Sequence, residues 1–185
     1  MPAIGAFGMQ PRLLVLAAAA ALALIAGTTA ASEQESELWS HVRVLFPNAH
    51  DMDPLAGRPP VAKVYAGDRV LGFVFLTDRI YPIPAYSGKP VSSLVGIDPA
   101  GVITGVRIVH HVEPILLAGV DEEDLAAFVE QYKGLSSRED IRIEGIDEAG
   151  RQVIDGITGA TITVMVINAS VARSLKRVLP TIGIR

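Results

Sequence analysis

Residues 61–77, VAKVYAGDRVLGFVFLT, contain two apolar runs separated by the turn-forming pair Gly67-Asp68. Both runs are rich in β-branched and aromatic residues, a composition that favours strands on either side of a hairpin turn. Residues 91–98 and 101–110 form a second such pair around Pro99-Ala100. Because strands joined by tight turns run antiparallel, the two pairs predict one antiparallel sheet.

Amphipathic helices are expected around this strand-rich region. Apolar side chains recur at helical spacing in three segments, and Pro47 disfavours helical geometry at the residue before it. The expected elements are helices over residues 32–46, 121–132 and 161–179 and short strands over residues 141–146 and through Val153 and Ile154. The fold class is therefore predicted as α+β, a single domain with an antiparallel sheet flanked by helices.

The first 31 residues have the order of parts of a secretory signal peptide. Arg12 is the only charged residue before Glu33, an apolar run follows it, and small residues precede Ser32. An uncleaved membrane anchor is the alternative, because the run nearly reaches the length of a spanning helix. We therefore expect an exported protein on the periplasmic or extracytoplasmic face of the membrane. The expected parts are residues 1–31 as signal peptide or anchor, 32–60 as helix and loop, and 61–180 as the main domain.

Composition excludes several classes of function. The chain has 16 Lys and Arg against 20 Asp and Glu, a formal net charge of -4, and no basic run, so we expect no nucleic-acid partner. It has no cysteine, which rules out thiol catalysis, disulfides and iron–sulfur ligation within these residues. The sequence contains no nucleophile elbow and no paired carboxylates on one identifiable element, so no catalytic residue is assigned.

The segment with the most unusual composition is DGITGATIT, residues 155–163. It predicts a turn of small and polar residues that leads directly into the helix at residues 161–179. The unpaired N–H groups at a helix start favour a phosphate, and Gly159 and Ala160 leave the backbone accessible. The three threonine hydroxyls could cap the helix or serve as attachment points. A helix cap with a glycine turn and no ligand explains the same residues.

This segment resembles the flavinylation motif of the FMN-binding domain family, in which Asp, two variable residues, Ser or Thr, Gly-Ala and then Thr precede a helix. Asp155, Thr158, Gly159-Ala160 and Thr161 fill every position. In that family a dedicated flavin transferase joins the phosphate of FMN to the threonine after Gly-Ala. The resemblance implies covalent FMN on Thr161 and an FMN-binding domain over residues 61–180. It also implies cofactor contacts from the rest of the motif: Asp155, Gly156, Thr158, Gly159, Ala160 and Thr163.

Beyond the motif, the chain is similar to the NosR/NirI branch of this family, which is related to the flavin subunits of Rnf and of sodium-pumping NADH:quinone reductase. The likeness is carried by LFP at residues 45–47, GFVFLT at 72–77, YSGKP at 86–90 and HHVEPILLAG at 110–119. A surface turn is the alternative for residues 86–90. Their functional interpretation is a rim at which Tyr86, Ser87 and Lys89 place a ring, a hydroxyl and a cation beside an anionic or aromatic ligand. The segment at 110–119 is similar to one that packs against the flavin in Rnf-type relatives, so the resemblance implies contacts from Glu113, Pro114 and Leu116.

The resemblance implies an electron-transfer flavoprotein rather than a stand-alone catalyst. A NosR-like role would support nitrous oxide reductase activity or expression, as in denitrification. The implied partners are a flavin transferase for maturation and a membrane or periplasmic redox partner. NosR-type proteins continue into transmembrane helices and a cysteine-rich region, so the chain is expected to be a stand-alone relative or a fragment. A non-redox ligand- or partner-binding module with the same fold is the alternative.

A third hypothesis is a metal chaperone that uses His110 or His111, with Glu113 close by in the sequence. Imidazole and carboxylate groups are suitable ligands for copper or zinc. However, neighbouring residues of a strand point to opposite faces, so the two histidines cannot easily share one metal ion. We therefore assign no metal site.

Overall fold

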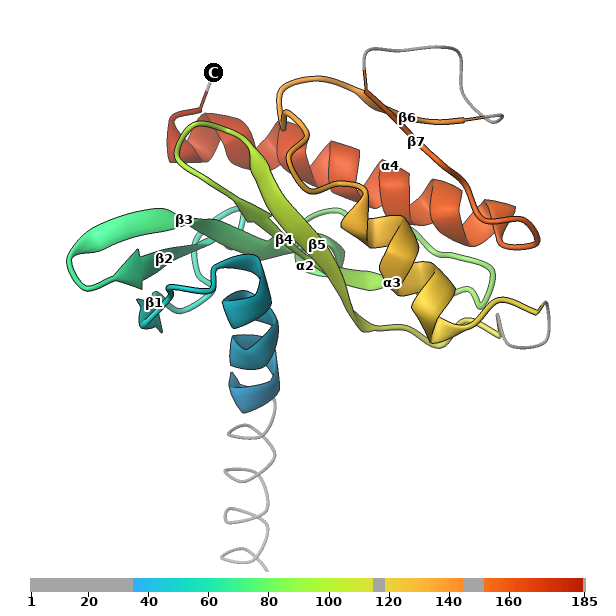
Figure 1. The fold of residues 1–185 in the computed structure, drawn as a ribbon, viewed down its shortest axis with the longest axis horizontal. Coiled ribbons are helices and arrows are strands. Elements are labelled where there is room, and N and C mark those ends of the chain that lie inside the picture. The colour runs from blue at the N-terminus through green and yellow to red at the C-terminus, as the bar shows by residue number, and fades with distance from the viewer. Residues whose placement is uncertain (1–34, 115–118, 145–151, 185) are drawn as a thin grey trace, which may run out of the picture. The chain divides into compact units, whose positions relative to one another are not determined.

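The computed structural model describes residues 35–114, 119–144 and 152–184 (Figure 1). It divides into two compact units, Met1–Trp39 and Ser40–Arg185. Only residues 35–39 of the first unit are described, and they lie in a helix at residues 35–45. The predicted signal peptide or anchor at residues 1–31 lies outside the described residues. None of the helices in the described ranges has the length and apolar character needed to cross a membrane.

The predicted antiparallel sheet is confirmed. Each strand pairs antiparallel with its neighbour in the chain, in the order β1-β2-β3-β4-β5. The first predicted hairpin closes where Ala66 pairs with Arg69 around the Gly67-Asp68 turn. The strands are β1 (Asp51–Met52), β2 (Ala62–Ala66), β3 (Arg69–Leu76), β4 (Ser92–Ile97) and β5 (Ile103–His110).

One face of the sheet is covered by the end of the N-terminal helix and by Phe46. The helix ends at residue 45, one residue before the predicted end, because Pro47 follows. A Cβ atom on Gly72 would lie 2.7 Å from the Phe46 ring, and one on Gly96 would lie 3.0 Å from it. The two glycines therefore leave room for the Phe46 side chain, which is 5% exposed, against the sheet.

The main hydrophobic core lies on the other face, where α3 (Glu122–Glu130) and α4 (Thr161–Val178) pack (Figure 1). Asp121 caps α3 as predicted, since its carboxylate accepts hydrogen bonds from the N–H groups of Glu123 and Asp124. The sheet contributes Phe75, Val95, Ile97 and Val106 to this core, α3 contributes Leu125, Phe128 and Val129, and α4 contributes Val164, Ile167 and Val171.

Four local elements differ from the predictions. The strand β1 lies in a segment predicted as loop. Thr77 begins the short helix α2 (Thr77–Ile80) instead of ending a strand. The helix α4 ends at Val178 and continues as a 3-10 helix, η2 (Leu179–Ile182), through Pro180. The strands β6 (Ile141–Ile143) and β7 (Gln152–Ile154) are present, but they form a separate parallel pair. Apolar runs indicate strands, but only the tertiary fold decides which strands pair.

Candidate functional site

The motif at residues 155–163 forms a turn and the first helical turn of α4, as predicted. Gly159 has a φ of +88°, a left-handed conformation that favours glycine. The next residue, Ala160, is the N-cap of α4, and no side chain makes a capping hydrogen bond there. The interpretation of this segment as a side-chain cap is therefore wrong in that respect. The first N–H groups of α4 lie in a helix start that suits an anion.

The threonine hydroxyls of the motif are in different environments. Thr158 and Thr161 are exposed, whereas Thr163 is 4% exposed. The Thr163 hydroxyl donates a hydrogen bond of 2.9 Å to Oε2 of Glu113. Thr163 is therefore a buried structural donor, and Thr158 and Thr161 are the motif hydroxyls open to modification.

Glu113 joins the motif to a second predicted segment. Its carboxylate accepts hydrogen bonds from the N–H of Tyr86 at 3.1 Å and of Ser87 at 2.9 Å, besides the one from Thr163. Burial raises the pKa of the Glu113 carboxyl, but hydrogen bonds from Ser87, Thr163 and Tyr86 outweigh burial and hold the pKa below its ordinary value. Glu113 is 7% exposed, so it connects two segments and does not present a free carboxylate to a ligand.

The loop at residues 86–89, whose N–H groups bind Glu113, presents polar and aromatic side chains to solvent. Tyr86 is 69% exposed, and Lys89 is also exposed. The Ser87 hydroxyl accepts a hydrogen bond from the N–H of Lys89, which closes the turn. Pro114 is exposed beside Glu113, and Leu116 lies outside the described residues. The structure thus joins Tyr86 and Ser87 of this loop to Thr163 of the motif through Glu113.

His111 extends this network to α3. Its Nδ1 accepts a hydrogen bond from the N–H of Glu113 at 3.2 Å, and its Nε2 lies 2.9 Å from Oε1 of Glu122. A neutral imidazole with its proton on Nε2 satisfies both contacts. His110 is exposed at the end of β5. In the described ranges, no group of three His, Asp or Glu side chains could hold a metal ion.

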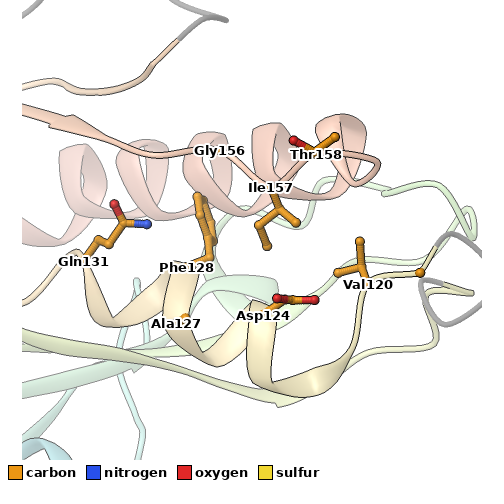
Figure 2. Close-up of a pocket in the computed structure, with 9 residues that line it drawn as sticks. Val120, Asp124, Ala127, Phe128, Gln131, Gly156, Ile157 and Thr158 are labelled. Atoms are coloured by element: carbon orange, nitrogen blue, oxygen red, sulfur yellow. The ribbon is translucent and has the colours of Figure 1, made fainter.

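A groove of about 530 Å³ lies between α3 and the turn of the motif, a size typical of small-molecule sites. Figure 2 shows the Phe128 and Ile157 side chains facing each other across this groove, with Thr158 near one end. The prediction that Phe128 belongs to the buried stripe of its helix is confirmed, since it is 1% exposed, and it also borders the groove. The lining residues are Gly119, Val120, Asp124, Ala127, Phe128, Gln131, Gly156, Ile157 and Thr158.

Gln131 holds the start of the motif against α3. Its side-chain Oε1 accepts a hydrogen bond of 2.7 Å from the N–H of Asp155, and its Nε2 donates one of 3.2 Å to the carbonyl of Asp155. The Gln131 amide thus pairs with both backbone groups of Asp155, as a neighbouring strand would. No pattern in the sequence indicates this contact, because the partners are 24 residues apart.

The arrangement fits a phosphate-bearing aromatic cofactor. An accessible helix start and an exposed hydroxyl, that of Thr161, suit a phosphate or phosphoester. Of the apolar side chains that line the adjacent groove, Ala127 is exposed and Ile157 is half-buried, so these two could contact a flat aromatic ring. Val120 and Phe128 are buried in the core behind them. Part of the groove wall and the exposed Thr161 lie within one continuous segment of the chain, residues 156–161.

Comparison with known proteins agrees with this fit. The FMN-binding domain family matches residues 86–176, which contain both loops and the motif. The chain is 34% identical to the regulatory protein NosR of Pseudomonas aeruginosa over 163 residues, 87% of this chain and 23% of that protein. It is 37% identical to the protein NirI of Paracoccus denitrificans over 108 residues, 58% of this chain and 15% of NirI.

A further relative is similar over most of its length. It belongs to the Na(+)-translocating ferredoxin:NAD(+) oxidoreductase complex of Acetobacterium woodii, and it is 27% identical over 177 residues, which cover 86% of this chain and 84% of the relative. By contrast, the chain spans less than a quarter of the length of the NosR and NirI proteins that it matches. Through residues 86–176, the chain belongs to the family of FMN-binding domains.

Proposed function

We propose that the chain is an exported electron-transfer flavoprotein domain that carries FMN as a phosphoester on Thr161. The observation that supports attachment is the exposed Thr161 hydroxyl in a helix turn that lacks a side-chain cap. The transferase would break the P–O bond to the leaving group of an activated phosphoester of FMN, and the Thr161 Oγ would lose its proton and form the new O–P bond. The adduct would then have the mass of one FMN less one water. Thr163 is a poor acceptor, because its hydroxyl is buried and bound to Glu113.

The remaining motif residues would hold the cofactor around that bond. The N–H groups in the first turn of α4, next to the exposed Gly159, would offset the phosphate charge. Ala127 and Ile157 would border the ring in the groove. Bound FMN supplies one- or two-electron redox chemistry, while the protein sets its position and potential.

The similarity to NosR, to NirI and to the oxidoreductase component supports the wider role. We propose that the domain relays electrons on the periplasmic or extracytoplasmic face of the membrane, after modification by a flavin transferase. Its exchange partner would be a membrane or periplasmic redox protein. A NosR-like role in supporting nitrous oxide reductase is proposed on the 34% identity to the NosR proteins. Export is proposed from the signal-like sequence of residues 1–31.

The test is coexpression with an active flavin transferase and an export route. The wild-type protein should remain yellow after denaturation and gain the mass of one FMN less one water. Thr161→Ala should remove the adduct, and Thr161→Ser should keep at least part of it. Thr158→Ala is the matched control, because it removes the other exposed motif hydroxyl and should leave the adduct in place. An adduct that survives Thr161→Ala would refute the site, and a colourless, unmodified wild type would favour the non-redox binding module.

A further inference from the structure

The Glu113 carboxylate is the point at which two segments far apart in the chain meet. The N–H groups of Tyr86 and Ser87 and the hydroxyl of Thr163 all donate to it. Thr163 lies 50 residues from Glu113 in sequence, and the loop residues lie 26 and 27 residues from it. Hydrogen bonds to a buried ionised acceptor are stronger than those between neutral groups. Loss of this carboxylate would therefore release both segments together.

This contact anchors the start of α4 through a side chain, at a helix end that has no side-chain cap. Ala160 is the N-cap and has no side-chain acceptor, so the first helical turn would otherwise tend to fray. Successive helical residues are rotated by about 100°, so Thr161 and Thr163 lie about 200° apart around the helix axis. Holding Thr163 inward on Glu113 consequently presents Thr161 outward. The exposure of the two residues agrees, since Thr163 is buried and Thr161 is exposed.

The same network ties the motif to α3 near both ends of that helix. Glu122, in the first turn of α3, contacts His111, whose Nδ1 accepts from the N–H of Glu113. Gln131, at the C-cap of α3, holds the backbone of Asp155. The groove lies between these two attachments, because α3 and the turn at residues 156–158 form its walls.

We propose that Glu113 is a positioning residue for flavin attachment, which acts through Thr163 to hold the Thr161 hydroxyl outward beside the groove. The inference rests on the proposed attachment of FMN at Thr161. Glu113 itself takes no part in forming the O–P bond. Its contribution is to keep the first turn of α4 and the Tyr86–Ser87 loop in one fixed relation.

Glu113→Gln is the most selective perturbation. The amide keeps the size of the side chain, but its NH₂ group is a donor and faces groups that also donate. Whichever way the amide lies, at least one of the N–H groups of Tyr86 and Ser87 loses its acceptor, and the Thr163 hydroxyl loses its charged acceptor. Thr163→Val removes the hydroxyl from the other partner at nearly constant shape, and Thr163→Ser restores it. Glu123→Gln is the matched control, because it makes the same chemical change at an exposed carboxylate on α3.

The first measurement is amide hydrogen exchange on the unmodified, full-length protein. Glu113→Gln should increase exchange in the Tyr86–Ser87 loop and at Val164, whose N–H makes the first backbone hydrogen bond of α4, whereas Glu123→Gln should match wild type. Thr163→Val should increase exchange in α4. Unchanged exchange in Glu113→Gln at both segments would overturn the clamp, and this readout is independent of any flavin.

The second measurement is the initial rate of FMN attachment by the transferase, followed by mass. Glu113→Gln and Thr163→Val should slow it about tenfold or more, the factor expected when one charge-assisted hydrogen bond no longer holds the reacting group. Thr163→Ser should return it to near the wild-type rate. Wild-type rates in both slow variants would overturn the positioning role even if exchange changes. A wild-type protein that stays unmodified would overturn the attachment of FMN to Thr161, and the positioning role with it. Failure of the proposed function is thus seen in the wild type, whereas failure of the positioning role alone is seen only in the variants.

Discussion

Replacing Thr163 with valine should lower stability by an amount that depends on Glu113. The substitution removes a buried hydroxyl that donates 2.9 Å to Oε2 of Glu113 and changes the shape of the side chain little. Hydrogen bonds to charged groups contribute about 1.5–3 kcal/mol net. Oε2 keeps a second donor, the N–H of Tyr86, so it is not left unpaired. We therefore expect a loss near the lower limit, about 1.5–2 kcal/mol at pH 7.

Urea unfolding of the unmodified protein at pH 7 measures this loss, and a double-mutant cycle assigns it. In a Glu113→Gln background, Thr163→Val should cost at least about 1 kcal/mol less than in wild type, because the charged acceptor is already gone. Thr163→Ser in the wild-type background is the control and should be close to neutral. A Thr163→Val cost below about 0.5 kcal/mol, or one that is equal in both backgrounds, would refute the claim that Thr163 is anchored by the Glu113 carboxylate.

Three further predictions concern acid stability, the buried polar pair and the sheet. The folded-state pKa of Glu113 is below its ordinary value of 4.5, so the stabilisation by its carboxylate should be present above pH 4.5 and be lost as the pH falls through the lowered pKa. The Glu113→Gln variant, unfolded at a series of pH values across this range, should lack that part of the pH dependence of stability. Equal pH profiles for the variant and the wild type would contradict this. Tyr132→Phe removes the donor to Oδ1 of buried Asn168 at 2.9 Å and should cost about 1–3 kcal/mol in urea unfolding, whereas a neutral result would mean that Asn168 finds another partner. Gly72→Ala would place a Cβ atom 2.3 Å from the Ile97 carbonyl oxygen and should lower the free energy of unfolding by about 1–3 kcal/mol. An unchanged melting temperature would show that β3 and β4 can move apart at this point without loss of stability.

Local chemistry in the sequence was sufficient for most of the elements. The Gly67-Asp68 turn between two strand-forming runs predicted the β2–β3 hairpin, and Asp121 predicted the start of α3. The motif at residues 155–163 predicted a turn followed by a helix, and it lies where α4 begins. These features depend on residues a few positions apart, so short-range propensities and capping hydrogen bonds specify them.

The candidate site was predictable only in part. Its component segments were identified from the resemblance to the FMN-binding domain family, whose match spans residues 86–176. The interpretation of Glu113 as a residue at the edge of the flavin did not include its bonds to Tyr86, Ser87 and Thr163. The contact of Gln131 with Asp155 was not predicted at all. In both cases a side chain contacts a segment that is distant in the chain. Such a contact leaves no periodic pattern in a single sequence.

The sequence by itself therefore determined the strands, the helix starts and the motif, because each is set by neighbours along the chain. Tertiary structure decided which hydroxyl of the motif is buried, since Thr163 and Thr161 differ only in the side of α4 that meets Glu113. It also decided the parallel pairing of β6 with β7, which apolar content does not encode. The physical reason is the same in both cases: burial and pairing depend on how segments distant in the chain pack together, as Glu113 and Thr163 do across 50 positions.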